Sequence, residues 1–241
     1  MPLPEFSPYL ASTLVTRVPV ATDQMTLEIA PPDGALELFQ RPGQFCRIRV
    51  AADEAAAHEG IFAMLSAPGE HALRFLIRTP NPEGGEAADR LAVLPIGSPL
   101  EITLPTGDGF PVDRARGRDL HFVATGTAIA PVRSAMEFVL SRRSDFGSLT
   151  LHHGLRSPEH LAIADDVERW RAAGVEIFLH YSEPRPDGSL LGVRVQDAVL
   201  ERVHAFERAA FIACGQSAMV KELREMIAAR RGDPTLVLHN Y

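Results

Sequence analysis

The sequence predicts two domains: an antiparallel Greek-key β-barrel and, after it, an α/β domain with a doubly wound parallel sheet. Its 241 residues are enough for two domains of roughly 100–130 residues each. Short apolar segments separated by Pro, Gly and Asp fill the first half, whereas apolar strands alternate with helical segments in the second half. The change falls at residues 111–118, so we expect the barrel over residues 1–113 and the α/β domain over residues 118–241.

Six strands are expected in the first half, because short runs that often alternate apolar with polar residues are typical of a barrel or a sandwich. One helical stretch, at residues 85–94, interrupts them. The Ala-rich polar stretch at residues 51–59 is expected to be a solvent loop. The predicted strands cover residues 13–20, 24–30, 44–50, 61–66, 72–79 and 99–105.

In the second half, five apolar strands alternate with three helices, which is typical of a parallel sheet covered on both faces. The helix at residues 158–173 begins with Ser157 as N-cap and Pro158 at its first position. Asp165 and Asp166 on this helix are expected to face solvent. The predicted strands are residues 120–125, 149–154, 175–181, 209–215 and 235–239, and the predicted helices are residues 128–143, 158–173 and 217–230.

The composition argues against several classes of protein. The net charge is −7, from 24 basic and 31 acidic residues, so the clustered cations needed to bind nucleic acid or anionic membranes are not indicated. Two cysteines, Cys46 and Cys214, form no CxxC pair and cannot hold an iron–sulfur cluster alone. His152 and His153 point to opposite faces of a strand, so we expect no metal site. With no signal segment and no long apolar run, we expect a cytoplasmic protein.

Two turns rich in small residues follow predicted strands and open predicted helices. They are GTAIAP at residues 126–131 and CGQSAMV at residues 214–220. Small residues let backbone N–H groups approach a pyrophosphate, and a helix N-terminus adds partial positive charge. Ligands of such sheets bind at the carboxyl ends of strands, where the strand order reverses. The alternatives are an ordinary tight turn and a structural buried cysteine.

These two segments, with three others, carry a family resemblance. GTAIAP resembles the GTGIAP segment of ferredoxin–NADP reductase-like proteins, and CGQSAMV resembles their CG-P-xx-MV segment. HHGLRSPEHL at residues 152–161 resembles the YGxRxxxDL segment between them, and RPGQF at residues 41–45 resembles the PGQF entry to the third barrel strand. Tyr241 stands where many members place an aromatic residue over the flavin ring. The matches follow the family's order over nearly the whole chain.

The resemblance implies a flavin-dependent NAD(P)H oxidoreductase. The barrel would hold FAD, and the second domain would bind NADH or NADPH. Hydride would pass from the nicotinamide to the flavin, and electrons would go on to a separate acceptor such as an iron–sulfur protein or an oxygenase component. A homodimer is left open. The implied catalytic residues are Cys214 and Tyr241, and the implied cofactor-binding residues are Phe62, Ala63, Met64, Arg78, Gly84, Gly85, Glu86, Ala87, Ala88, Gly126, Thr127, Ala128, Pro131, Arg156, Ser182, Gly215, Gln216 and Met219.

The flavin motif of the family, Arg-x-Tyr-Ser, is degenerate in this chain. Anchoring on residues 66–68 places Gly60 at the Arg, Phe62 at the Tyr and Ala63 at the Ser, so a phosphate-binding cation and a hydroxyl for flavin N5 are both lost. Ala88 replaces a further hydroxyl at the start of the short helix. Losing these contacts weakens flavin affinity by a few powers of ten. Three alternatives follow: FAD, a loosely held flavin such as FMN, or no flavin.

The nucleotide side of the resemblance is better preserved. Glu183 follows the third predicted strand of this domain and favours NADH, because it would repel a 2′-phosphate and could accept from a ribose hydroxyl. Arg156, Arg185 and Arg194 favour NADPH instead. The alternative to a redox enzyme is a flavin-free ferredoxin reductase-like subunit that acts in binding or assembly.

Overall fold

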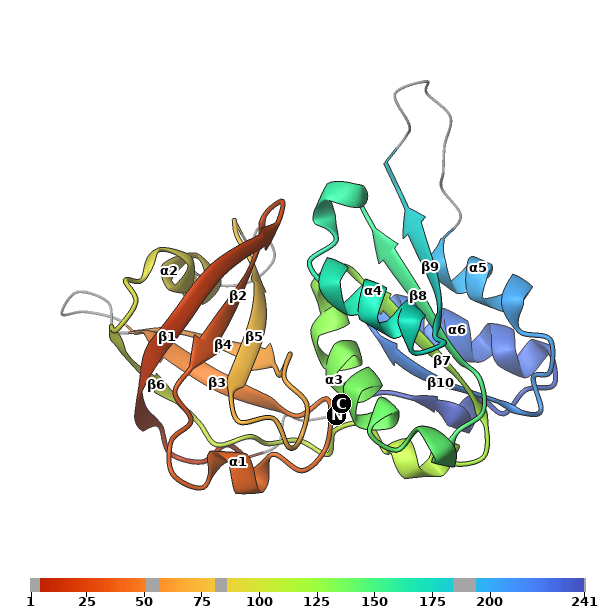
Figure 1. Cartoon of the computed structure of the whole chain (residues 1–241), viewed down its shortest axis with the longest axis horizontal. Coiled ribbons are helices and arrows are strands. Elements are labelled where there is room, and N and C mark those ends of the chain that lie inside the picture. The colour runs from red at the N-terminus through yellow and green to blue at the C-terminus, as the bar shows by residue number, and fades with distance from the viewer. Residues whose placement is uncertain (1–4, 51–56, 81–85, 184–193, 241) are drawn as a thin grey trace.

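The computed structural model describes residues 5–50, 57–80, 86–183 and 194–240, which form two domains that lie side by side (Figure 1). The first domain is built on a six-stranded antiparallel sheet and the second on a five-stranded parallel sheet. This confirms the predicted fold class. None of the helices in these ranges combines the length and the apolar character that crossing a membrane requires.

The strands of the first domain lie in the order β4-β3-β6-β1-β2-β5. An isolated bridge between Met64, just after β4, and Phe75 in β5 joins the two edges and closes the barrel. Alternate side chains point inwards, and Leu14, Leu27 and Ile48 are fully buried. The elements of this domain are β1 (Leu10–Ala21), β2 (Gln24–Ile29), α1 (Ala35–Leu38), β3 (Phe45–Val50), β4 (His58–Ala63), β5 (Leu73–Arg78), α2 (Ala87–Val93) and β6 (Pro99–Ile102).

The parallel sheet has the order β11-β10-β7-β8-β9. Its first strand, β7, is central; β8 and β9 follow on one side, and β10 and β11 are added on the other. Helices α3 and α4 cover one face and helices α5 and α6 the other. Phe122 and Val123 of β7 accordingly belong to different buried clusters. The elements are β7 (Asp119–Thr125), α3 (Ile129–Leu140), β8 (Leu149–Leu155), α4 (Ala164–Ala172), β9 (Glu176–Tyr181), α5 (Val195–Arg202), β10 (Ala209–Cys214), α6 (Ser217–Ala229) and β11 (Val237–Leu238).

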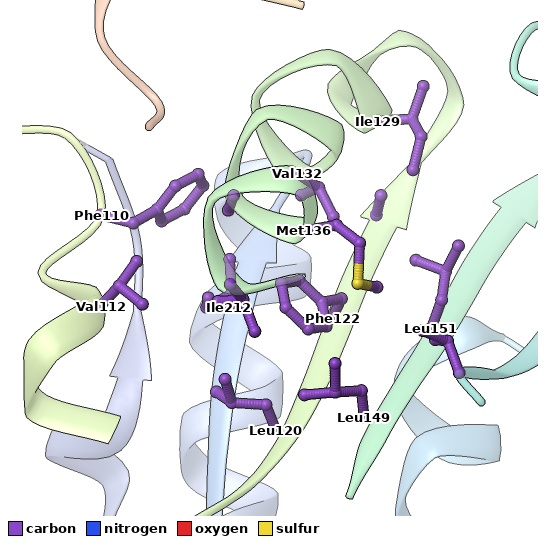
Figure 2. Close-up of a cluster of buried hydrophobic side chains, with 14 of the residues drawn as sticks. Phe110, Val112, Leu120, Phe122, Ile129, Val132, Met136, Leu149, Leu151 and Ile212 are labelled. Atoms are coloured by element: carbon purple, nitrogen blue, oxygen red, sulfur yellow. The ribbon is translucent and has the colours of Figure 1, made fainter. Parts of the chain in front are cut away.

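The two domains share one buried cluster beneath α3. Phe110, from the segment that leaves the barrel, packs in the same cluster as Phe122 of β7 and Met136 of α3 (Figure 2). Leu65, from the barrel, belongs to it as well. Because this cluster buries apolar surface from both domains, it holds them against each other.

Arg133 of α3 adds polar contacts to this interface. Its buried guanidinium donates from Nη1 to the carbonyl oxygen of Leu65 at 3.0 Å and pairs with Glu70 at 3.0 Å. It also pairs with Asp166 of α4 at 2.8 Å. The sequence-based expectation that Asp166 faces solvent is therefore wrong, because a buried cation requires carboxylate partners.

Other elements also differ from the predictions. Strand β4 begins at His58, inside the stretch expected to be a loop, and ends at Ala63, because its pairing with β3 runs over these residues. The predicted helix at residues 158–173 is split into a 3₁₀ turn, Pro158–His160, and α4. Ser157 does not cap α4, and its hydroxyl lies 2.9 Å from Nδ1 of His160. Helices α1 and α5 are absent from the prediction.

Candidate functional site

Two turns lie side by side at the carboxyl end of the parallel sheet. Strand β7 ends at Thr125 and continues through a 3₁₀ turn, Gly126–Ala128, into α3. Strand β10 ends at Cys214 and continues into α6. The two strands are neighbours, and the strand order reverses between them, so this is where sheets of this kind bind ligands. The two segments that the sequence singles out therefore come together.

A pocket of about 810 Å³ opens over these turns, within the size range of small-molecule sites. Its walls come from the ends of four parallel strands, from the starts of α3, α5 and α6, and from one barrel residue. Nine of the predicted cofactor-binding residues line it: Arg78, Gly126, Thr127, Ala128, Arg156, Ser182, Gly215, Gln216 and Met219.

The two glycines of these turns have different physical roles. A Cβ atom at Gly215 would lie 2.5 Å from Oγ1 of Thr125 and 2.7 Å from Cε of Met219, so only glycine lets the two turns touch. Gly126 has a positive φ of 51°, and no described atom lies within 4 Å of its Cβ position. Its backbone therefore stays open to the pocket, next to the partial positive charge at the start of α3.

A buried histidine holds the first turn in place. Nε2 of His153 lies 3.1 Å from the carbonyl oxygen of Gly126, and the side chain is 1% exposed. Burial lowers the pKa of His153 to about 4, so the ring is neutral at pH 7. Since a carbonyl oxygen can only accept, Nε2 carries the proton and donates it. The carbonyl oxygen of Gly126 therefore has its hydrogen-bond partner within the protein.

Three arginines bring positive charge to the pocket, and each is paired with a carboxylate. The pairs are Arg78 with Asp23 at 3.2 Å, Arg156 with Glu183 at 3.6 Å, and Arg194 with Glu222 at 2.8 Å between nitrogen and oxygen. Guanidinium groups suit phosphates, and carboxylates suit sugar hydroxyls. The rim can therefore bind both parts of a nucleotide. Arg185 lies outside the described residues.

Cys214, a predicted catalytic residue, links the end of the chain to the barrel. Its thiol donates to Oδ1 of Asn240 at 3.7 Å, and Nδ2 of Asn240 donates to the carbonyl oxygen of Gly43 at 2.9 Å. Burial raises the pKa of Cys214 to about 12, so the thiol stays protonated and is not a thiolate nucleophile at pH 7. Tyr241, the other predicted catalytic residue, lies outside the described residues.

The barrel residues expected to bind a flavin pack tightly against one another. A Cβ atom at Gly60 would lie 2.8 Å from Cε2 of Phe62 and 3.2 Å from Cβ of Ala87. Met64 is fully buried, and Ala87 and Ala88 are each 2% exposed. Only Ala63 and Phe62 remain half-buried at this strand end.

The start of α2 carries negative charge. Glu86 lies at its N-terminus, with Oε2 3.0 Å from Nδ1 of His58. FAD, which the resemblance implies, needs cations or free N–H groups for its pyrophosphate at this place. A carboxylate and an apolar ring do not fit that requirement. Gly84 and Gly85 lie outside the described residues.

Several residues of the pocket were not predicted from the sequence. Thr125 could have been found, because it directly precedes the first turn. The others come from β8, β9, α5 and α6 or lie next to these elements, and only the fold brings them together: Gly154, Leu155, His180, Tyr181, Arg194, Val195, Gln196, Ala218 and Glu222. Pro131, which was predicted, is buried in the first turn of α3 and is not among the lining residues. Over the described ranges, no group of three or more His, Cys, Asp or Glu side chains is placed to hold a metal ion.

Residues 122–225 match the family described as "Oxidoreductase NAD-binding domain". The gamma subunit of sulfhydrogenase 1 from Pyrococcus furiosus is 27% identical over 135 residues, which cover 54% of this chain and 46% of that protein. The electron transfer subunit of dihydroorotate dehydrogenase B (NAD(+)) from Shouchella clausii is 24% identical over 223 residues, which cover 91% of this chain and 78% of that protein. A ferredoxin NADP+ reductase from Neisseria gonorrhoeae, solved with bound FAD and NADP, has a TM-score of 0.77 at 19% identity over 92% of each chain.

The match spans about half the length of the sulfhydrogenase subunit and more than three quarters of the dihydroorotate dehydrogenase subunit. The similarity to the solved reductase extends over both domains and shows a common fold. The family match adds the identity of the second domain. The chain therefore has the two-domain fold of the ferredoxin–NADP reductase-like proteins, and its second half matches the NAD-binding domain family of oxidoreductases.

Proposed function

We propose that this chain is the NAD(P)H-binding subunit of an electron-transfer assembly. The observation that carries the proposal is the pocket of about 810 Å³ at the reversal of strand order, lined by both glycine turns. The turn at Gly126 and Thr127, with the N-terminus of α3 behind it, receives the pyrophosphate of the nucleotide. The nicotinamide lies toward Gly215, on the side where Asn240 contacts the barrel.

The rim residues favour NADH over NADPH. Ser182 and Glu183 follow β9, and Glu183 is half-exposed beside Arg156. A carboxylate accepts hydrogen bonds from a ribose, whereas it repels a 2′-phosphate. While Arg156 is paired with Glu183, the carboxylate partly neutralises its charge, so Arg156 attracts the 2′-phosphate of NADPH less strongly. NADH therefore binds more tightly in this proposal.

The bound nucleotide supplies a hydride that a partner chain accepts. The nicotinamide gives up the hydride with both electrons and is left oxidised. The acceptor is of flavin class and passes electrons on to an iron–sulfur protein or an oxygenase component. The names of two relatives support a partner: one is a subunit of a sulfhydrogenase and the other an electron transfer subunit.

The other arrangement, FAD or a loosely held flavin in this chain's own barrel, is less well supported. It needs a cation for the flavin phosphates and a hydroxyl for flavin N5. Phe62 packed on Gly60 supplies neither, and Glu86 repels a phosphate. The geometry thus favours the flavin-free subunit over the flavoprotein.

Equilibrium titration of the full chain with NADH and NADPH tests this function. We expect saturable binding of NADH in the micromolar range, weaker binding of NADPH, and loss of both when Gly215→Val fills the space between the turns. Ala11→Val, at an exposed position of the barrel strand β1, is the control and should bind NADH like the wild type. Absence of binding of either nucleotide at millimolar concentration would refute the proposal.

A further inference from the structure

The inner face of β4 meets helix α2 at one end of the barrel (Figure 1). Strand β4 pairs with β3 so that Phe62 is opposite Cys46 and Gly60 is opposite Ile48. Directly opposed residues of an antiparallel pair point to the same side, and Cys46 and Ile48 are fully buried. Phe62 and Gly60 therefore lie on the inward side of β4, toward α2, where both are half-buried.

The ring of Phe62 takes the space beside Gly60. A Cβ atom at Gly60 would lie 2.8 Å from Cε2 and 2.9 Å from Cζ of the ring, and 3.2 Å from Cβ of Ala87. The position where the related motif has an arginine thus has no room even for a methyl group while Phe62 keeps its place. Phe62 also packs against the core cluster of the barrel, so burial holds the ring. It does not stand free to stack on a flavin.

The edge of this contact carries carboxylates where a cofactor phosphate would bind. Glu86 at the N-terminus of α2 is 3.0 Å from His58, and Asp89 in the first turn accepts a hydrogen bond from Oγ1 of Thr79 at 2.9 Å. Carboxylates near a helix N-terminus interact with the partial positive charge that otherwise attracts a phosphate. The carboxylates of Glu86 and Asp89 thus lie at the helix N-terminus where the related proteins would bind a cofactor phosphate.

We propose that Phe62 and the His58–Glu86 pair close the flavin-type site of the barrel, so that this chain binds no FAD. Three features support closure independently: the filled space at Gly60, the packing of the half-buried Phe62 on the barrel core beside the buried Ala87, and the charge of Glu86. The barrel instead supports the nucleotide domain through the shared core and the contacts of Arg133. Only the assignment of the flavin to a partner rests on the proposed function, because closure is a property of the barrel alone.

Titration of the purified full chain with FAD, in the absence of nicotinamide nucleotide, tests the closure. FAD fluorescence reports binding, and mass spectrometry of the protein as purified reports flavin that is already bound. We expect the wild type to show no saturation up to the highest FAD concentration used. Phe62→Ala should bind FAD at least about tenfold more tightly than that limit, because it opens the space beside Gly60. Phe39→Ala removes another buried phenylalanine of the barrel core without opening this contact, so its FAD affinity should equal that of the wild type.

A second variant rebuilds the site from the opposite direction. Gly60→Arg, Phe62→Ala, Ala63→Ser and Ala88→Ser, introduced together, remove the ring beside position 60 and restore the cation and two of the hydroxyls of the family motif. A charge-assisted contact and two hydrogen bonds correspond to a gain in FAD affinity of about 100-fold or more. Emission of Trp170 and binding of NADH report whether each variant is folded, and Phe62→Leu replaces Phe62→Ala if the latter does not fold.

The outcomes distinguish the closure of the barrel site from the proposed NAD(P)H-binding function. Stoichiometric, tightly bound FAD in the wild type overturns the closure. Folded Phe62→Ala and rebuilt variants that gain no FAD affinity also overturn it, because the named residues would then not be the cause. If the wild type does not bind NADH, the proposed function is wrong, whereas the closure of the barrel site is not affected by this result.

Discussion

A strand, a glycine and the start of a helix occur together in both domains, with opposite results. In the parallel domain, Gly126 and Gly215 let two turns approach each other and leave an open pocket of about 810 Å³. In the barrel, Gly60 leaves space that the ring of Phe62 fills. The first arrangement leaves backbone N–H groups available to a ligand, whereas the second buries apolar atoms against apolar atoms.

The comparison shows that a glycine beside a helix start does not by itself mark a ligand site. What decides is which neighbour uses the space that the glycine leaves. Polar or small neighbours such as Thr125 keep a pocket open, and a large apolar neighbour such as Phe62 closes it. Charge decides in the same way, because Arg156 lines the pocket while Glu86 lies at the closed contact.

The domains also differ in their buried histidines, and this predicts the largest effect. His121, His152 and His153 are buried in the parallel sheet, and burial lowers their pKa values to about 4, 3 and 4. The unfolded chain protonates them near pH 6.5, so it binds more protons than the folded chain between pH 4 and pH 6.5. Stability is therefore highest above pH 6.5 and falls as the pH drops. His153 alone accounts for a loss of about 3 kcal/mol.

Urea unfolding between pH 7.5 and pH 4.5 measures this loss, with the emission of Trp170 in α4 as the probe of the parallel domain. His121→Phe, which keeps the stacking on Phe211, should reduce the pH slope by about one proton. His71→Gln, at an exposed histidine of the barrel, should leave the slope unchanged. An unchanged slope in His121→Phe would contradict the assignment of the acid sensitivity to this sheet.

Arg133 joins the two domains, and its removal should have the next largest effect. Arg133→Met removes the buried cation that joins Glu70, Asp166 and the carbonyl oxygen of Leu65. The two carboxylates keep Arg74 and Arg169 as partners, and the loss costs about 3 kcal/mol. The barrel and the parallel domain should then unfold in separate steps, as followed by urea titration and calorimetry. Arg142→Met, at an exposed arginine over the ring of Phe138, is the control and should cost less than about 1 kcal/mol. Equal losses in the two variants would show that Arg133 does not couple the domains.

Much of the fold could be predicted from the sequence because its signals are local. Alternating apolar runs identified the barrel strands, and apolar stripes identified α3 and α6 within a few residues of their observed ends. The predicted boundary between residues 113 and 118 stays a prediction. Helix α5 was missed, because its short apolar stripe is interrupted by charged residues at Asp197 and Glu201.

The sequence identified those residues of the pocket that are adjacent along the chain, and their role in binding stays a prediction. Both glycine turns were found, and they line the same pocket. Glu222 and Gln196 were missed, since they meet only through the packing of α5 on α6, where Nε2 of Gln196 donates to Glu222 at 2.8 Å. The packing of Phe62 on Gly60 was not foreseen either, because a sequence does not reveal which neighbour fills a space.

The two glycines, exchanged for alanine, sharpen the comparison between the domains. In Gly215→Ala the new Cβ meets Thr125 and Met219 inside the pocket, which costs about 1–3 kcal/mol of stability and should weaken NADH binding at least about tenfold. In Gly60→Ala the new Cβ meets the end of the Phe62 ring, which costs about 1 kcal/mol. NADH binding should then be unchanged. Titration of both variants with NADH measures this difference. Weaker NADH binding in Gly60→Ala would show that the barrel contact and the pocket are coupled.

The smallest predicted effect concerns the choice between NADH and NADPH. Glu183→Gln removes a negative charge from the rim and frees Arg156, whose Nε lies 3.6 Å from the carboxylate. Both side chains are half-exposed, so water screens them, and the change in selectivity toward NADPH amounts to about 1 kcal/mol, or about fivefold. The measurement is the ratio of the dissociation constants for NADH and NADPH. Glu222→Gln is the control: this pocket carboxylate belongs to α6 and is paired with Arg194, not with Arg156, so the ratio should not change. A ratio that shifts equally in both variants would mean that the net charge of the pocket, and not the position of Glu183, determines the preference.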